Sequence, residues 1–293
     1  MRLMFTRVAL LFLFSILTTT SIIAQDFQGK AYYFSKTNMD MSRFGRGRQL
    51  NEQEKKQMEE RMKSWLEKTY ILTFNAEESI FKEDEKLSSP VGGRGPSMFG
   101  SSFSAGPQYK NVKEKLFLQD QEFFGKKFLI KEALKPYQWQ MSGETKKIGE
   151  YTCFKAMTLR PATELNWMST MRDRRNDEDN SEASKSENET AENEDKNEEI
   201  EVVQVIAWYS PQIPVSQGPG DYWGLPGLIL EVTAGDNMML CSKIIMNPKE
   251  KELIEAPKKG EEVTKEEYHD IINEKMQEFR DSRRRGGGRS GGR

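Results

Sequence analysis

Residues 110–159, KNVKEKLFLQDQEFFGKKFLIKEALKPYQWQMSGETKKIGEYTCFKAMTL, decide the fold of this chain. Runs of apolar, aromatic and β-branched residues recur along this stretch, and short polar or glycine-bearing junctions separate them. Such junctions suit hairpins, because parallel strands would need crossover connections of about a dozen residues or more. The stretch therefore predicts successive antiparallel strands over Lys110–Gln119, Lys126–Glu132, Tyr137–Ser142 and Gly149–Leu159.

Similar runs on both sides of this stretch extend the predicted sheet. Alternating apolar residues and β-branched or aromatic composition are typical of strands that have one buried face. The further candidates are Phe27–Phe34, Thr69–Phe74, Ser79–Leu87, Glu201–Tyr209, Leu225–Thr233 and Met238–Met246. We therefore expect a mainly β protein with a single antiparallel sheet.

Two segments, about 51–68 and 264–280, have helical spacing instead. Asn51 with Glu54, and Thr264 with Glu267, have the spacing of a capping box at a helix start. The first helix also carries an apolar stripe, which consists of Met58, Met62, Trp65 and Leu66. An apolar stripe of this kind packs on a core, so we expect both helices to flank the sheet, with the first lying on it.

The first residues have the layout of a secretory signal peptide, predicted over residues 1–24. Basic Arg2 and Arg7 precede an apolar run, Val8–Leu17, and a small residue, Ala24. The run is shorter than the roughly 20 residues that a membrane-spanning helix needs. Gln25 stands where a lipoprotein would have cysteine. We expect a protein of the periplasm or outer envelope that is not a lipoprotein and has no transmembrane span after signal removal.

The remaining chain is expected to form one β-rich domain over residues 25–282, with two interruptions. Residues 88–107 are rich in glycine and lack periodicity, which is typical of a long loop. Residues 165–199 are dense in Glu, Asp, Asn and Ser, and this composition predicts a disordered acidic insertion. Arginine and glycine dominate residues 283–293, which we expect to be a disordered tail.

The chain has two cysteines, Cys153 and Cys241. An exported protein meets an oxidising compartment where a disulfide can persist, but pairing requires Cα atoms within roughly 7 Å, which sequence does not give. Two buried thiols on strands are the alternative, and both interpretations stay open.

Motifs for catalysis are sparse. His269 is the one histidine and is expected on the solvated surface of the last helix, without a nucleophile beside it. The three His and Cys residues are too scattered for a zinc site. A Gly-x-Ser-x-Gly match at residues 288–292 lies in the tail, without the strand, turn and helix that give it meaning. We therefore assign no catalytic residue, metal or cofactor, although a catalytic carboxylate pair stays open.

The segment 209–227 combines prolines, glycines and aromatic residues. Proline fixes φ and removes a backbone donor, so this segment cannot be a central strand before residue 227 and is expected to be a preset loop. The candidate binding residues are Tyr209, Pro211, Pro214, Tyr222, Trp223, Leu225 and Pro226. Rigid aromatic rings are favoured where partners bind. In the alternative interpretation, these rings only cover the open end of the sheet.

The same segment carries a resemblance. GLPGLI at 224–229, WYSPQIPV at 208–215, IGEYTCFKA at 148–156 and KKG at 258–260 resemble the pattern of the GLPGLI family of bacterial exported proteins. The resemblance extends over most of residues 25–282, except the acidic insertion. It implies an envelope location, no established activity, and a strongly curved half-barrel sheet like that of lipoprotein-carrier proteins. It also suggests an outer-membrane β-barrel transporter as a partner.

Three functions remain. The preferred hypothesis is a non-enzymatic accessory or binding protein that presents the loop 209–227 to an envelope partner or an apolar ligand. The first alternative is a carboxylate-dependent hydrolase. The second is a charge-mediated interaction protein that uses the Arg/Gly tail and the acidic insertion. Nucleic acid is not expected as a partner, because export removes the protein from it.

Overall fold

The computed structural model describes residues 27–38, 51–84, 106–162 and 202–287. The predicted signal peptide, most of the loop 88–107, the acidic insertion 165–199 and residues 288–293 lie outside the described residues. The sequence predictions for those segments therefore stay predictions.

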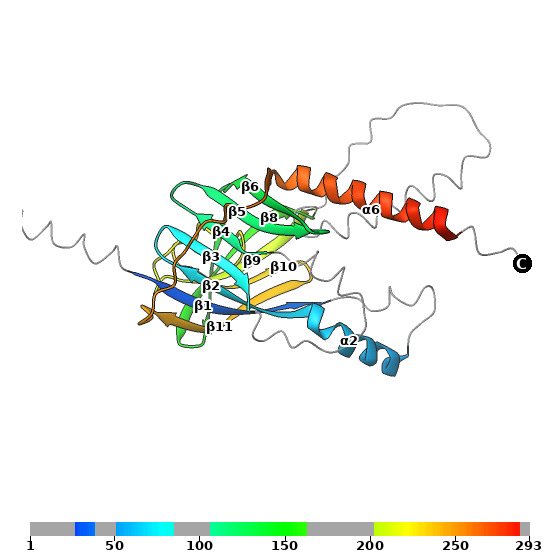
Figure 1. The fold of residues 1–293 in the computed structure, drawn as a ribbon. Coiled ribbons are helices and arrows are strands. Elements are labelled where there is room, and N and C mark those ends of the chain that lie inside the picture. The colour runs from blue at the N-terminus through cyan, green and yellow to red at the C-terminus, as the bar shows by residue number, and fades with distance from the viewer. Residues whose placement is uncertain (1–26, 39–50, 85–105, 163–201, 288–293) are drawn as a thin grey trace, which may run out of the picture.

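The described residues form one twelve-stranded sheet and two long helices. Figure 1 shows how they are arranged. The strands are β1 (Gly29–Thr37), β2 (Glu67–Phe74), β3 (Glu78–Glu83), β4 (Gln108–Asn111), β5 (Leu116–Phe123), β6 (Lys126–Ala133), β7 (Gln140–Ile148), β8 (Tyr151–Pro161), β9 (Val202–Ser210), β10 (Leu228–Ala234), β11 (Asn237–Met246) and β12 (Glu261–Val263). Their order in the sheet is β12-β6-β5-β4-β3-β2-β1-β11-β10-β9-β8-β7. The predictions of a mainly β protein with a single sheet and two helices are confirmed.

The prediction of a wholly antiparallel sheet is wrong, because β12 pairs with β6 in parallel. The chain leaves β11 at Met246 and crosses to the far edge of the sheet through residues 247–260. On the way, Ile254 and Ala256 pack on a cluster that includes Tyr109, and Glu252 exchanges hydrogen bonds with Gln28. A strand reached by such a crossing can run in the same direction as its neighbour. Three residues are too few to reveal β12 from sequence.

The predicted strand Lys110–Gln119 is two strands, β4 and β5, joined by a tight turn. The side chain of Asn111 makes this turn by accepting hydrogen bonds from the backbone N–H groups of Lys113 (3.0 Å) and Glu114 (2.8 Å). Asparagine commonly nucleates turns in this way. Lys115 follows with φ 54°, in the left-handed region. This turn was not recognised in the sequence because lysines occupy it.

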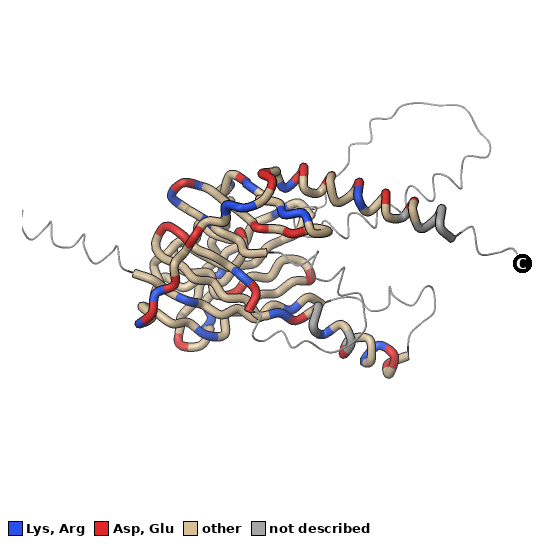
Figure 2. The backbone as a smooth tube through the Cα atoms, viewed as in Figure 1, with Lys and Arg blue, Asp and Glu red and all other residues tan. Residues whose placement is uncertain are grey.

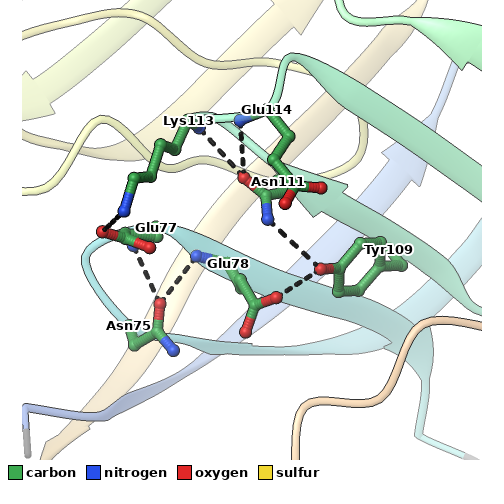
Figure 3. A network of polar contacts seen from close by, with 7 residues as sticks. All are labelled: Asn75, Glu77, Glu78, Tyr109, Asn111, Lys113 and Glu114. Atoms are coloured by element: carbon green, nitrogen blue, oxygen red, sulfur yellow. Dashed lines mark hydrogen bonds and ion pairs between the residues drawn. The ribbon is translucent and has the colours of Figure 1, made fainter. Parts of the chain in front are cut away.

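A polar network ties this turn to the turn between β2 and β3 (Figure 3). Lys113 forms an ion pair with Glu77 at 2.8 Å, and Tyr109 donates a hydrogen bond to Glu78. Asn75 in turn accepts hydrogen bonds from the backbone N–H groups of Glu77 and Glu78, at 2.8 and 2.6 Å. The contacts link both turns and so help to fix the register of β3 against β4.

Both predicted capping boxes are confirmed, but the helices differ from expectation in other ways. The helix α2 (Glu52–Leu66) continues directly into β2 and projects beyond the sheet in Figure 1. Every α2 side chain that the structure describes is half-buried or exposed, so the expectation that this helix lies on the sheet is wrong. The helix α6 (Lys265–Gly287) packs Tyr268 and Ile272 against Phe128 of β6. It continues past 280, so the tail predicted from 283 is helical up to Gly287.

Pairing register places a continuous set of side chains on one face of the sheet. Across β1 to β6, one row runs Ala31, Leu72, Phe81, Gln108, Gln119 and Ile130. The adjacent row runs Gly29, Phe74, Ser79, Lys110, Phe117 and Glu132. Side chains in one row share a face because alternate residues of a strand point to the same side. This face holds the core and the cavity described below.

The sheet is strongly curved. Its strands β4 and β8 stand seven positions apart in the order, which would separate them by roughly 34 Å in a flat sheet. Lys110 of β4 nevertheless contacts Gly220, and Arg160 of β8 contacts the next residue, Asp221. The sheet must therefore curl around the segment 211–227, while its edge strands β12 and β7 are at opposite ends of the order.

Candidate functional site: a cavity on the concave face

A cavity of about 1340 Å³ lies on the concave face. Residues from every strand except β12, together with α6 and the segment 220–222, line it. Typical sites for drug-sized ligands hold about 300–1,000 Å³, so this cavity accommodates a larger molecule. It follows from the curvature of the sheet, which brings strands that are distant in the order around one space.

Lys110 fixes the segment 211–227 across the interior of the curved sheet. Its side chain is 1 % exposed, and Nζ donates hydrogen bonds to the carbonyl oxygens of Gly218 (2.9 Å), Gly220 (3.0 Å) and Tyr222 (2.7 Å). The hydroxyl of Ser79 donates to Gln217 Oε1 at 2.9 Å. The segment is therefore attached to β3 and β4.

Two tryptophans attach the same segment to residues 135–139, which connect β6 to β7. The indole N–H of Trp139 donates to the Trp223 carbonyl at 2.8 Å, and the indole N–H of Trp223 donates to the Lys135 carbonyl at 3.1 Å. A buried tryptophan needs such a partner for its one polar group. The segment 211–227 is therefore attached both to β3 and β4 and to the connection between β6 and β7.

An ion pair between Arg160 and Asp221 forms the polar part of the cavity wall. The guanidinium nitrogens lie 3.3 and 3.0 Å from the two carboxylate oxygens, which is a two-point contact. The guanidinium also lies over the rings of Tyr137 (5.3 Å) and Tyr222 (5.5 Å). All four residues line the cavity.

The charges around Asp221 determine its protonation. Burial raises the pKa of the Asp221 carboxyl, but Arg160, Lys265 and Lys110 lower it, and the net pKa is below the ordinary value. Asp221 is therefore ionised at neutral pH. An ionised carboxylate that is already paired with a guanidinium serves to hold the wall in place.

We expect Arg160→Met to lower the free energy of unfolding by about 2 kcal/mol at pH 7, because it leaves a half-buried carboxylate without its cation. Adding Asp221→Leu should recover part of this loss. The pKa of Asp221 is depressed in the folded state, so its stabilisation is present above pH 3.8 and is lost as the pH falls. The difference between wild type and Arg160→Met should therefore shrink below that pH. Urea unfolding of wild type, Arg160→Met, Asp221→Leu and the double variant tests this, and losses that simply add would show that the pair is not coupled.

The structure buries the rings that we expected the loop 209–227 to present. Tyr209 is 7 % exposed, Tyr222 5 %, Trp223 9 % and Leu225 0 %, while the three candidate prolines, Pro211, Pro214 and Pro226, are exposed. Exposure of the rings is thus the part of the prediction that is wrong, because Lys110 and the tryptophans fasten the segment inside the curve. The alternative interpretation, that these rings cover the sheet, agrees with the burial. Among the seven candidate residues, Tyr222 alone lines the cavity.

Apart from Tyr222, the residues that build the cavity were not predicted from the sequence, and one of them was placed wrongly. His269, expected on the solvated surface, is half-buried and lines the cavity together with the neighbouring residues of α6. Burial lowers its pKa, Lys265 lowers it further, and Asp270 acts in the opposite direction. Lys110 and Arg160 were not singled out either. Their signal in the sequence is weak, because each is one basic residue in a strand of mixed composition.

Cys153 and Cys241 are both buried and are free thiols in the structure. Both belong to one apolar cluster. Burial raises the pKa of Cys153 to about 11 and that of Cys241 to about 12, so neither is a reactive thiolate at neutral pH. Within the described ranges, His, Cys, Asp and Glu form no group of three or more that could hold a metal ion.

Comparison with known proteins gives one family match. Residues 139–231 match the model of a family described as a protein of unknown function, Porph_ging. The matched range includes Arg160, Asp221 and the whole segment 211–227, whereas Lys110 lies outside it. Among curated proteins, no relative of the chain was found.

Distant similarities to solved structures include two structures of PNGF-II. A structure of PNGF-II in space group C2 aligns with a TM-score of 0.46 and 12% identity over 84% of this chain and 32% of that one. Another, in space group P21, gives 0.43 and 13% identity over 84% and 33%. The chain thus spans about a third of the length of the solved structures that it matches.

Proposed function

We propose that this protein is a non-enzymatic binding protein of the bacterial envelope that holds a ligand in the concave cavity. The observation that carries the proposal is the cavity of about 1340 Å³, whose wall is built from distant strands and held by buried polar contacts. A preorganised wall of this kind is what a binding site needs, because the side chains are ordered before the ligand arrives. The segment 209–227 serves as part of this wall, in place of the exposed loop that we expected.

The envelope location rests on the signal-peptide layout of residues 1–24 and on the resemblance to the GLPGLI family. The hexapeptide at 224–229 lies inside the range that matches the Porph_ging model. A curved sheet with a helix beside its cavity also fits the half-barrel of lipoprotein-carrier proteins. None of the helices in the described residues combines the length and apolar character needed to cross a membrane. An outer-membrane β-barrel transporter is the partner that the resemblance suggests.

Two observations favour binding over the alternatives. Of the four acidic side chains that line the cavity, Asp221 is paired with Arg160, and Glu132 accepts a hydrogen bond from the backbone N–H of Lys265 at 2.7 Å. These two carboxylates are occupied in holding the wall, which weighs against a carboxylate-dependent hydrolase that would use them. Figure 2 shows acidic and basic residues interspersed along the described chain. A charge-mediated role would therefore depend on the acidic insertion and the end of the Arg/Gly tail, which lie outside the described residues.

Filling the cavity tests the proposal. Ala133 is exposed and lines the cavity, so Ala133→Trp should occupy space without displacing core residues. We expect a small molecule from envelope extract to be retained by the wild type in native mass spectrometry. Ala133→Trp should reduce this retention at least tenfold, whereas the matched control Ala133→Ser should retain it.

Thermal unfolding of the three proteins serves as the control, because a substitution at an exposed site changes stability by only about 0.5 kcal/mol. A wild type that emerges from the extract without any added mass contradicts the proposal. Equal retention by wild type and Ala133→Trp contradicts the assignment of the cavity as the binding site.

A further inference from the structure

The wall of the cavity carries a row of uncharged hydrogen-bonding groups. Gln108 and Gln119 are register partners on β4 and β5, and Gln108 Nε2 donates to Gln119 Oε1 at 3.2 Å. Gln119 Nε2 then donates to Gln121 Oε1 at 3.0 Å. The amides of Gln108 and Gln119 thus hold each other in place where they line the cavity. Each NH₂ group has a second N–H that it can donate to a ligand.

The helix α6 faces the same cavity with a polar stripe. Its residues at 266, 269, 270, 273 and 277 line the cavity at helical spacing, and Met276 is the one apolar side chain of α6 among the lining residues. The opposite stripe of α6 holds Tyr268 and Ile272 in the core. A helix that lined a site for an acyl chain would be expected to present apolar residues on this stripe, because polar groups buried against hydrocarbon lose their hydrogen bonds.

The charges around the cavity balance. Four basic and four acidic side chains, apart from His269, line it: Lys82, Lys135, Arg160, Lys265, Glu132, Asp221, Glu266 and Asp270. A strongly charged ligand would require an excess of the opposite sign. Aromatic rings complete the wall, among them Tyr70 and Phe81, which stack with their centroids 4.8 Å apart. The lining thus offers amides, balanced charges and aromatic faces, beside aliphatic side chains such as Ile130, Leu134 and Met239.

From this lining, and resting on the proposed function, we infer that the ligand is a neutral oligosaccharide of several sugar units. Each sugar hydroxyl both donates and accepts hydrogen bonds, which matches amide side chains that do the same. The apolar C–H faces of sugars can pack on aromatic rings. The cavity exceeds the volume range of drug-sized ligands, which favours several units over a single sugar.

An extended peptide fits the cavity less well. Peptides are commonly recognised by adding a strand to the edge of a sheet, where backbone groups are available. The cavity lies on the face of the sheet, where the backbone groups of β4 and β5 are already paired with neighbouring strands. Peptide binding is therefore an outcome that would overturn the inference.

Isothermal titration calorimetry tests the ligand class with four neutral hexasaccharides: maltohexaose, cellohexaose, chitohexaose and xylohexaose. Palmitate and an uncharged ten-residue peptide are the comparison ligands. We expect at least one hexasaccharide to bind the full chain. The variants Gln108→Leu and Asn273→Leu, on β4 and α6, should each weaken binding at least tenfold. Gln57→Leu on α2, a residue that does not line the cavity, is the matched control and should bind like the wild type.

Circular dichroism and thermal unfolding of each variant separate lost binding from lost folding, and Asn273 is exposed, so its variant is expected to fold. Binding of palmitate or the peptide in place of every sugar overturns the inference but leaves a binding function standing. Absence of binding by all six probes also overturns the inference. It leaves a binding function standing if native mass spectrometry still finds a retained small molecule. If that molecule is missing as well, the proposed function fails with the inference.

Discussion

Replacing Lys110 by methionine is expected to lower the free energy of unfolding by about 3 kcal/mol at neutral pH. The change removes the donor that serves the carbonyl oxygens of Gly218, Gly220 and Tyr222. Leaving a buried carbonyl unsatisfied costs about 1–3 kcal/mol each. Part of this cost is offset, because methionine has no charge to remove from water. Urea unfolding followed by tryptophan fluorescence measures the difference, and Trp223 also reports on the segment that Lys110 holds.

The same lysine predicts a pH dependence. Burial lowers the pKa of Lys110 to about 7, and Asp221 acts in the opposite direction. Its pKa in the unfolded chain is 10.5, so between these values the unfolded state holds a proton that the folded state has released. Stability therefore rises with pH across this interval, by up to about 1.4 kcal/mol per pH unit from this group. The loss caused by Lys110→Met should be larger at pH 9 than at pH 7.

The difference in unfolding free energy between wild type and Lys110→Met cancels the contributions of other titrating groups, because the two proteins share every other ionisable group. Lys68, on β2 outside the lining of the cavity and half-buried beside Glu83, is the matched control. Lys68→Met should cost at most about 1 kcal/mol, because partly exposed ion pairs contribute little. A difference in unfolding free energy between wild type and Lys110→Met that stays flat from pH 7 to 9 would show that Lys110 keeps its charge, and the lowered pKa of this lysine would be wrong.

Local pattern was sufficient to predict most elements of the fold. Alternation and hairpin junctions found most of the strands, although the strand predicted over Tyr137–Ser142 shares only residues 140–142 with β7. The pairs Asn51 with Glu54 and Thr264 with Glu267 found both helix starts. Each of these signals acts within a few residues. The errors at β4 and at β12 are also local, since a four-residue strand and a three-residue strand are too short to show a period.

The cavity could not be predicted, because it depends on contacts between residues far apart in the chain. Lys110 and Tyr222 lie 112 positions apart, and Arg160 and Asp221 lie 61 apart. Nothing in the neighbouring sequence distinguishes Lys110 from an exposed strand lysine such as Lys131. The aromatic loop was recognised as preset, but its rings face inward because of these distant partners. A loop's stiffness can be inferred from its prolines, whereas its exposure depends on the rest of the fold.

Gly227→Ala is expected to destabilise the fold by about 3 kcal/mol. A Cβ at this position would lie 2.3 Å from the carbonyl oxygen of Ser210 and 2.8 Å from the backbone nitrogen of Pro211. Both are backbone atoms of the segment that leaves β9, so neither can turn aside as a flexible side chain could. Inserting atoms into a packed site costs about 1–3 kcal/mol and sometimes more. The added Cβ would strain the start of β10, where Leu228 pairs with Ser210 of β9. Urea unfolding measures the loss.

Substitutions at two other glycines distinguish the stability loss caused by steric crowding from the loss caused by backbone conformation. A Cβ at Gly143 on β7 would have nothing within 4 Å, and this glycine has no positive φ, so Gly143→Ala should be neutral within about 0.5 kcal/mol. Gly224 has φ 91° and only Trp139 nearby, at 3.8 Å, so Gly224→Ala should cost about 1–2 kcal/mol through its left-handed backbone alone. The expected order of loss is Gly227, Gly224, Gly143. If Gly227→Ala were as stable as Gly143→Ala, the close approach of β9 to β10 at this turn would be wrong, and with it the wall on which the cavity depends.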